Sequence, residues 1–262
     1  MESTNGSIPI GPIQIHAVDA QELTRQLITD SRAAGKTHHV VTANAQFYNL
    51  AEQRADFRAC VAQAEYVCAD GISVVMACQW LGKKKITRVP GVELVESLCA
   101  HSASSGLPVY FFGGKAGSAE MAVAALARRY PGFEAAGFSC PPYGFEKDER
   151  SLRLALEDIR RVRPSIIFVA LGAPRQEFFI HKYIRPMGVP VAIGVGGSFE
   201  IIAGRVRRAP RWVQRCGFEW AYRWVQEPGR LTMRYLVGNT TFFLYVLRYF
   251  LRGNYRSERS TT

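Results

Sequence analysis

Short runs of apolar and β-branched residues alternate with amphipathic stretches of helical length along most of this 262-residue chain. Such runs are typical of buried strands. The candidate strands are His39–Thr42, Glu65–Ala69, Val109–Gly113, Glu134–Phe138, Ser165–Ala170 and Val191–Val195. The candidate helices are Ala20–Ala33, Ala45–Ala62, Ile72–Leu81, Val92–Ser104, Ser118–Tyr130, Glu149–Val162 and Gln176–Ile184. The alternation predicts an α/β fold, a Rossmann-like parallel sheet flanked by helices, with ligands bound at the carboxyl ends of the strands.

Composition excludes several classes of protein. Hydrophobic residues make up 48% of the chain and charged residues 21%, which is enough for a large core and too apolar for a disordered chain. A membrane-spanning helix needs roughly 18 uninterrupted apolar residues, and the best candidate, 242–251, contains Arg248. The first residues show no basic segment followed by an apolar one, so we expect a cytoplasmic protein.

Cysteine and histidine spacing gives no sign of a metal site. The six cysteines include no C-x-x-C pair, which favours buried, reduced thiols over zinc ligands or disulfides. The five histidines lack ligand spacing, and there is no D-x-D motif to hold a divalent ion on a nucleotide diphosphate. We therefore expect neither a metal nor a cofactor.

Positive charge is concentrated at the C-terminal end. Residues 203–262 contain 12 Arg, no Lys and three Glu, a net charge of +9, whereas the other 202 residues carry only +2. We therefore divide the chain into an α/β body, 1–202, and a basic helical appendage, 203–262. Arginine suits bidentate binding of phosphate, whether on nucleic acid, on anionic lipid or on a diphosphate substrate.

Polar side chains follow the predicted strands, where a ligand of this fold would bind. Asp70 ends the second strand and is either a general base or the N-cap of the helix that begins at Ile72. Thr42 and Asn44 are either ligand contacts or turn and cap residues. Gln176 either binds a ligand or faces solvent, and Arg88 is a further candidate contact.

Two glycine-rich loops also follow strands, and such loops let backbone N–H groups meet a phosphate. The glycines assigned to substrate binding are Gly113, Gly114, Gly196 and Gly197. The alternative is that they only permit tight turns. Neither loop matches G-x-G-x-x-G with its ribose-binding acid or G-x-x-x-x-G-K-[ST], which disfavours a nicotinamide-dependent oxidoreductase and a P-loop ATPase.

The appendage has an amphipathic pattern when helical spacing is assumed from Arg230 to Arg256. At about 100° per residue, five arginines lie within about 40° of one line along the helix: Arg230, Arg234, Arg248, Arg252 and Arg256. Leu236, Phe243, Leu247 and Phe250 lie on the opposite side of the helix. Such a helix suits an anionic membrane interface, or it packs on the body with a charged outer face. A basic, aromatic-rich tail also fits a nucleic-acid-binding protein, which is the rival class.

Collinear motifs extend from about residue 40 to residue 234. They are Thr42-Ala-Asn44-Ala, Ala69-Asp-Gly-Ile-Ser-Val74, Arg88-Val-Pro-Gly91, Phe112-Gly-Gly-Lys115, Gly172-Ala-Pro-Arg-Gln-Glu177, Gly194-Val-Gly-Gly197, Ala203-Gly-Arg-Val-Arg-Arg-Ala-Pro-Arg-Trp212, Glu219-Trp-Ala-Tyr-Arg223 and Glu227-Pro-Gly-Arg230. In this order they resemble the WecG/TagA/CpsF family of bacterial glycosyltransferases.

The resemblance implies transfer of a sugar from a UDP-sugar to a polyprenyl-diphosphate-linked sugar, with inversion and without a metal. The protein would be a peripheral enzyme at the cytoplasmic face of the bacterial inner membrane. The catalytic base of the family falls on Asp70, and its polar active-site groups fall on Thr42, Asn44, Arg88 and Gln176. The arginines that the family is thought to use for the lipid diphosphate and the membrane fall on Arg223 and Arg230. Where the family often has a further arginine, this chain has Met233, and Arg234 follows it.

The donor sugar is the weakest inference from this resemblance. Gln46-Phe47 beside Asn44 departs from the N-acetylmannosaminyl members, so we expect UDP-glucose and a role in exopolysaccharide synthesis. The alternative is an N-acetylmannosaminyltransferase of the teichoic-acid or common-antigen type. The apolar stripes fit either a core or a homo-oligomer interface.

Overall fold

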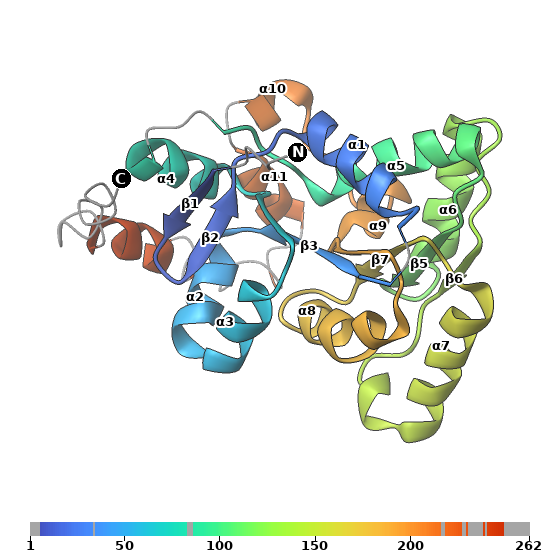
Figure 1. Ribbon diagram of the computed structural model, residues 1–262. Coiled ribbons are helices and arrows are strands. Elements are labelled where there is room, and N and C mark those ends of the chain that lie inside the picture. Colours follow the sequence, from blue (N-terminus) through green and yellow to red (C-terminus); the bar gives the residue numbers. More distant parts are fainter. Residues whose placement is uncertain are drawn as a thin grey trace.

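The six predicted strands form one parallel sheet in the computed structural model (Figure 1). The structure describes residues 6–33, 35–82, 86–215, 218–226, 229, 238 and 240–248, without the side chains of 82, 211, 215 and 223. The strand order is β4-β3-β8-β7-β5-β6. The strands are β3 (His38–Ala43), β4 (Tyr66–Ala69), β5 (Val109–Gly113), β6 (Gly137–Ser139), β7 (Ile166–Ala170) and β8 (Val191–Gly194). The α/β prediction is confirmed, with β6 a few residues later than expected.

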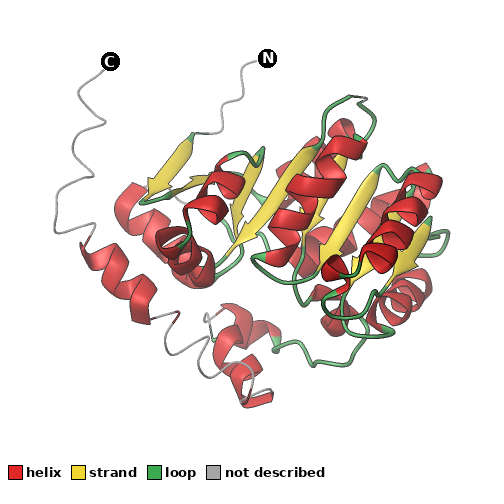
Figure 2. Ribbon diagram, turned by 90° about the horizontal axis from the view of Figure 1, so that it is seen from below, coloured by secondary structure: helices red, strands yellow, loops and turns green. Residues whose placement is uncertain are grey.

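Helices cover both faces of the sheet (Figure 2). On one face lie α1 (Ala20–Asp30), α5 (Gly91–Ser105), α6 (Ser118–Arg129) and α9 (Ser198–Ile202). On the other lie α2 (Ala45–Gln53), α3 (Ala55–Ala62), α4 (Ile72–Gly82), α7 (Glu149–Val162), α8 (Arg175–Phe179) and the π-helical turn η2 (Ile180–Ile184). The short 3₁₀ turns are η1 (Phe145–Lys147) and η3 (Arg185–Met187). The predicted helix over 45–62 is therefore two helices, separated at Arg54.

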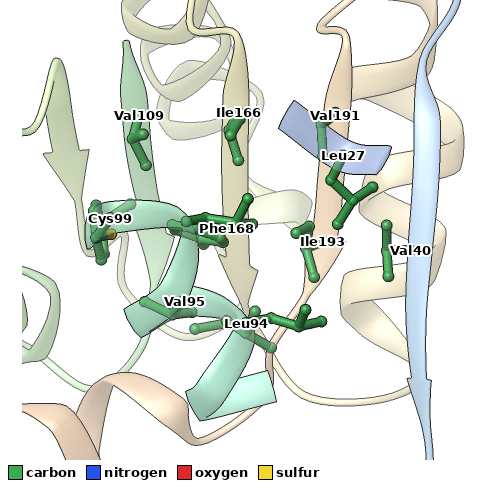
Figure 3. Close-up of a cluster of buried hydrophobic side chains, with 14 of the residues drawn as sticks. Leu27, Val40, Leu94, Val95, Cys99, Val109, Ile166, Phe168, Val191 and Ile193 are labelled. Carbon is green, nitrogen blue, oxygen red and sulfur yellow. The ribbon is translucent and has the colours of Figure 1, made fainter. Parts of the chain in front are cut away.

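Because side chains alternate along each strand, buried hydrophobic clusters form on both faces of the sheet; in the described part of the chain, one lies under α1, α5, α6 and α9 and two lie on the other face. On β5, Phe111 packs toward α5 and α6, whereas Tyr110 and Phe112 pack toward α7 and α8. Phe111 lies beside Phe168 in the sheet, and both are buried under α5 and α6. Figure 3 shows Phe168 in this cluster. Completely burying one such side chain contributes about 1.5–3 kcal/mol. These cores hold the carboxyl ends of the strands in fixed positions.

An antiparallel hairpin, β1 (Ser7–Ile10) and β2 (Ile13–His16), precedes the sheet and is absent from the sequence prediction. Its isoleucines alternate and are all buried: Ile8, Ile10, Ile13 and Ile15. This period-two pattern around Gly11-Pro12 is the signal that could have revealed it.

The C-terminal region packs on the body where it is described. Two short helices, α10 (Arg211–Arg215) and α11 (Glu219–Gln226), follow α9, and residues 240–248 are helical. Phe242 and Val246 are buried in the same core as the hairpin, beside which their helix lies (Figure 1). A Cβ at Gly11 would stand 1.4 Å from the Tyr245 hydroxyl, so a side chain at this position would require Tyr245 to move. The predicted division at 202/203 stays a prediction.

No helix within the described parts of the chain is long and apolar enough to span a membrane. The described cysteines are unpaired, and burial raises the thiol pKa values of Cys60, Cys68 and Cys78 to about 12. Such thiols behave as small apolar side chains.

Candidate active site

A cavity of about 730 Å³ lies at the carboxyl edge of the sheet. Strand β5 leads outward to β6 while its neighbour β7 leads the other way to β8, and ligands of open α/β sheets bind where such a reversal occurs. Of the body residues predicted from sequence, those lining the cavity are Thr42, Asn44, Asp70, Arg88, Gly114, Gln176, Gly196 and Gly197. One cavity therefore gathers side chains from strand ends far apart in the sequence.

Asp70 follows β4 at the cavity wall. Its backbone N–H donates to Ala43 O at 2.9 Å, and Val89 N–H donates to Ala69 O at 2.8 Å. These bonds fix Asp70 next to the end of β3 and bring the segment that carries Arg88 alongside. The carboxylate is half-buried and lines the cavity, a position from which it can act on a bound hydroxyl group.

Thr42 and Asn44 have structural roles as well as cavity positions. The buried Thr42 hydroxyl donates to Gly194 O at 2.8 Å, which joins β3 to β8. Asn44 is the N-cap of α2, and its Oδ1 accepts from Gln46 N–H at 3.0 Å. The cap interpretation of Asn44 is thus correct, and its role in substrate binding stays a prediction.

The first backbone N–H groups of the loop after β5 donate hydrogen bonds to other parts of the protein. Gly114 N–H donates to Ala170 O, and Lys115 N–H donates to Glu200 Oε1, both at 2.8 Å. Gly113, with φ of +96°, is outside the cavity lining, and a Cβ there would stand 2.9 Å from Ala170 O. Its observed role is therefore the turn, and binding of substrate by Gly113 stays a prediction.

Gln176 is buried and holds two loops of the cavity. Its Oε1 accepts from Gly172 N–H at 3.1 Å and from Gly196 N–H at 3.0 Å, and its Nε2 donates to Glu177 Oε1 at 2.7 Å. Burial raises the pKa of Glu177 to about 7, and Glu177 Oε2 has no hydrogen-bond partner within the described part of the chain. The alternative that Gln176 faces solvent is wrong, because its side chain is buried in the cavity wall.

Arg88 pairs with a residue of the appendage. Its guanidinium lies 2.7 Å from the carboxylate of Glu219, the first residue of α11, and both side chains are about four-fifths buried. Glu219 also lies 4.0 Å from Arg208 Nε, and Arg208 donates to Glu93 Oε1 at 2.6 Å. Since Glu219 and Arg208 line the cavity, the appendage forms part of its wall.

Several lining residues were missed or left unassigned by sequence reasoning. Arg175 is held by Glu146 at 2.6 Å and covers the ring of Tyr143 at 4.4 Å. Glu200 anchors the Lys115 amide from α9. Among the other unassigned lining residues are Lys115, Tyr143, Arg208, Glu219 and Trp220. No sequence pattern indicates that these residues share one cavity, although motifs quoted from the sequence contain Lys115, Arg175, Arg208, Glu219 and Trp220.

The model of the WecG/TagA/CpsF family of glycosyl transferases matches residues 8–256. The chain belongs to this family. A family relative, the N-acetylglucosaminyldiphosphoundecaprenol N-acetyl-beta-D-mannosaminyltransferase of Bacillus spizizenii, is 34% identical over 222 residues, which cover 85% of this chain and 84% of the relative. The enzyme of the same name from Bacillus subtilis strain 168 is 31% identical over 191 residues, which cover 73% and 72%.

Membership in the WecG/TagA/CpsF family confirms the resemblance, and the Rossmann-like fold confirms what it implied about architecture. The assignment of arginines to the lipid diphosphate and the membrane stays a prediction. The Arg223 side chain, Arg230 and Arg234 all lie outside the described residues, as do Leu236, Phe250, Arg252 and Arg256.

Proposed function

We propose that this chain transfers N-acetylmannosamine from its UDP derivative to an N-acetylglucosaminyl diphosphate carried by a polyprenol. The support is membership in a glycosyl transferase family together with a polar cavity at the carboxyl edge of the sheet. The relatives carry this activity in their names, which favours the N-acetylmannosaminyl alternative over the expected UDP-glucose. Family membership also favours an enzyme over the nucleic-acid-binding rival, for which a gel shift with random oligonucleotide is the test.

The proposed reaction is a direct displacement at the anomeric carbon. Asp70 accepts the proton of the acceptor hydroxyl as the oxygen attacks, and the bond to UDP breaks on the opposite side, which inverts the configuration. Arg88 stabilises the charge that develops on the departing diphosphate. The amides of Gly114 and Lys115 are bonded within the protein, so we assign phosphate binding mainly to arginine side chains. The proposed mechanism uses no metal.

We assign the exposed apolar surface of the appendage to an anionic membrane. Trp212 and Val225 are 69% and 76% exposed. With Phe218 they line an apolar groove on α10 and α11. Tryptophan favours the membrane interface, and Arg207, which lines the same groove, would be attracted to anionic headgroups. The resulting peripheral attachment would bring the cavity to a lipid-borne acceptor.

The experiment is a donor panel with purified protein. UDP-N-acetylmannosamine, UDP-N-acetylglucosamine and UDP-glucose are each incubated with a short-chain N-acetylglucosaminyl diphosphate lipid, and product is measured by mass. UDP-N-acetylmannosamine should give product at least about tenfold faster than either other donor, and that product should have the mass of one added N-acetylhexosamine. Preferred use of UDP-glucose would restore the expectation from sequence and contradict this proposal.

A further inference from the structure

Two arginines from different parts of the chain converge on one carboxylate in the cavity wall. Arg88 precedes α5 and lies 2.7 Å from Glu219, and Arg208, on the segment between α9 and α10, lies 4.0 Å from the other oxygen of the same carboxylate. All three residues line the cavity. The Glu219 carboxylate therefore occupies a position between two guanidinium groups that a phosphate-bearing ligand could also occupy.

Arg208 is incompletely paired. Its terminal nitrogen donates to Glu93, whose side chain is 42% exposed and lies outside the cavity lining. Its Nε is buried and has no hydrogen-bond partner among the described atoms. An unpaired buried donor is unfavourable, and an acceptor at the cavity side would satisfy it. Arg208 therefore has a donor available for a ligand.

The chemistry of the pair selects a diphosphate. Two guanidinium groups from separate segments present several donors, and phosphate oxygens accept them in bidentate fashion. A diphosphate has more charge and more acceptor oxygens than one carboxylate, so it can replace Glu219 on both arginines. Glu219 is fixed at the start of α11, so it competes with a diphosphate for the two guanidinium groups only from that position.

We propose that Arg88 and Arg208 form a diphosphate subsite, which Glu219 occupies until a substrate diphosphate displaces it. Arg208 is thus a substrate-binding residue, and Glu219 is a competing group supplied by the appendage. This inference rests on the proposed function, since both substrates of that reaction carry a diphosphate. The diphosphate belongs either to the nucleotide or to the polyprenyl acceptor.

Binding is measured by calorimetry on the full-length chain with two probes, UDP and farnesyl diphosphate. Glu219→Gln removes the competing charge and should tighten the binding of at least one probe by about five- to tenfold. Arg208→Gln should weaken the binding of the same probe by about tenfold or more. Glu93→Gln is the matched control, because it also removes a carboxylate that pairs with Arg208, but one that lies outside the cavity lining. It should change the affinity for either probe less than about twofold.

The probe that responds identifies the source of the diphosphate. Equal affinity of Glu219→Gln and the wild type for both probes, or equal effects of Glu219→Gln and Glu93→Gln, would overturn the proposal. If Glu219→Gln unfolds, retention of full affinity by folded Arg208→Gln would overturn it. The assay needs no turnover: a wild type that shows this binding pattern and transfers no N-acetylmannosamine contradicts only the proposed function.

Discussion

Gln176 and Glu177, neighbours in the sequence, hydrogen-bond to each other inside the protein, with 2.7 Å between Nε2 and Oε1. The bond fixes the amide so that its oxygen faces the N–H groups of Gly172 and Gly196. Two loops of the cavity therefore depend on one buried side chain, which depends on a buried carboxyl group. The cost of burying that group should be visible in the pH dependence of stability.

Glu177→Gln should stabilise the protein at neutral and alkaline pH. The folded-state pKa of Glu177 is about 7, above its ordinary value of 4.5, because burial disfavours the ionised form. Between these values the folded state binds more protons than the unfolded state, so the wild type loses stability as pH rises. The advantage of the variant should grow from pH 4.5 to 7, by up to about 3 kcal/mol. Denaturant unfolding at a series of pH values measures it.

The matched control for this variant is Glu157→Gln, which removes a carboxylate from the exposed face of α7. Its difference from the wild type should stay within about 0.5 kcal/mol across the same pH range. A Glu177→Gln curve parallel to that of the wild type would show that Glu177 does not titrate in this window.

Gly113→Ala should destabilise the protein more than Gly144→Ala does. Both glycines have positive φ, +96° and +84°, which costs an alanine about 1 kcal/mol. Only at Gly113 would the new Cβ meet backbone, at 2.9 Å from Ala170 O, whereas Gly144 faces open space. We expect about 1 kcal/mol for Gly144→Ala and about 2–3 kcal/mol or more for Gly113→Ala by denaturant unfolding. Equal losses would mean that the approach to β7 imposes no constraint.

Trp212→Ser combined with Val225→Ser should weaken binding to anionic vesicles. Both side chains are exposed on the appendage, and transfer of a large apolar side chain out of water contributes about 1.5–3 kcal/mol. Cosedimentation should show a loss of about tenfold or more in partitioning. Leu154→Ser removes an exposed apolar residue from α7 and should have no effect. Equal binding of the double variant and the wild type would remove this surface from the membrane contact.

The central sheet and most of the cavity were predictable because they follow from local patterns. The carboxyl ends of parallel strands meet at one edge of the sheet, so placing Thr42 and Asp70 at the ends of two strands also placed them in one cavity. The hairpin was predictable in principle from its alternating isoleucines. The break at Arg54 was not, because the apolar pattern continues on both sides of it.

Contacts between distant segments could not be predicted in this way. The pairing of Arg88 with Glu219 joins residues far apart in the chain, and no spacing rule connects them. The same holds for the support that Glu200 gives to the Lys115 amide. The interior position of Gln176 depends on Gly172 and Gly196 in two loops and on Glu177 in α8, which a single sequence does not reveal.

The turnover of Asp70→Asn tests the central claim, that the cavity catalyses sugar transfer with this carboxylate as the base. The substitution keeps the size of the side chain and removes its basicity. Asp148→Asn is the control, since Asp148 is the exposed N-cap of α7 and asparagine also caps helices. Transfer is followed under saturating substrate, with the donor that the panel selects, and the unfolding temperature and UDP affinity are measured on the same samples.

We predict that Asp70→Asn lowers kcat by about 100-fold or more while folding and UDP affinity stay at wild-type values. Asp148→Asn should keep full turnover. A kcat of Asp70→Asn within about threefold of the wild type would contradict the assignment of the base and, with it, the proposed mechanism.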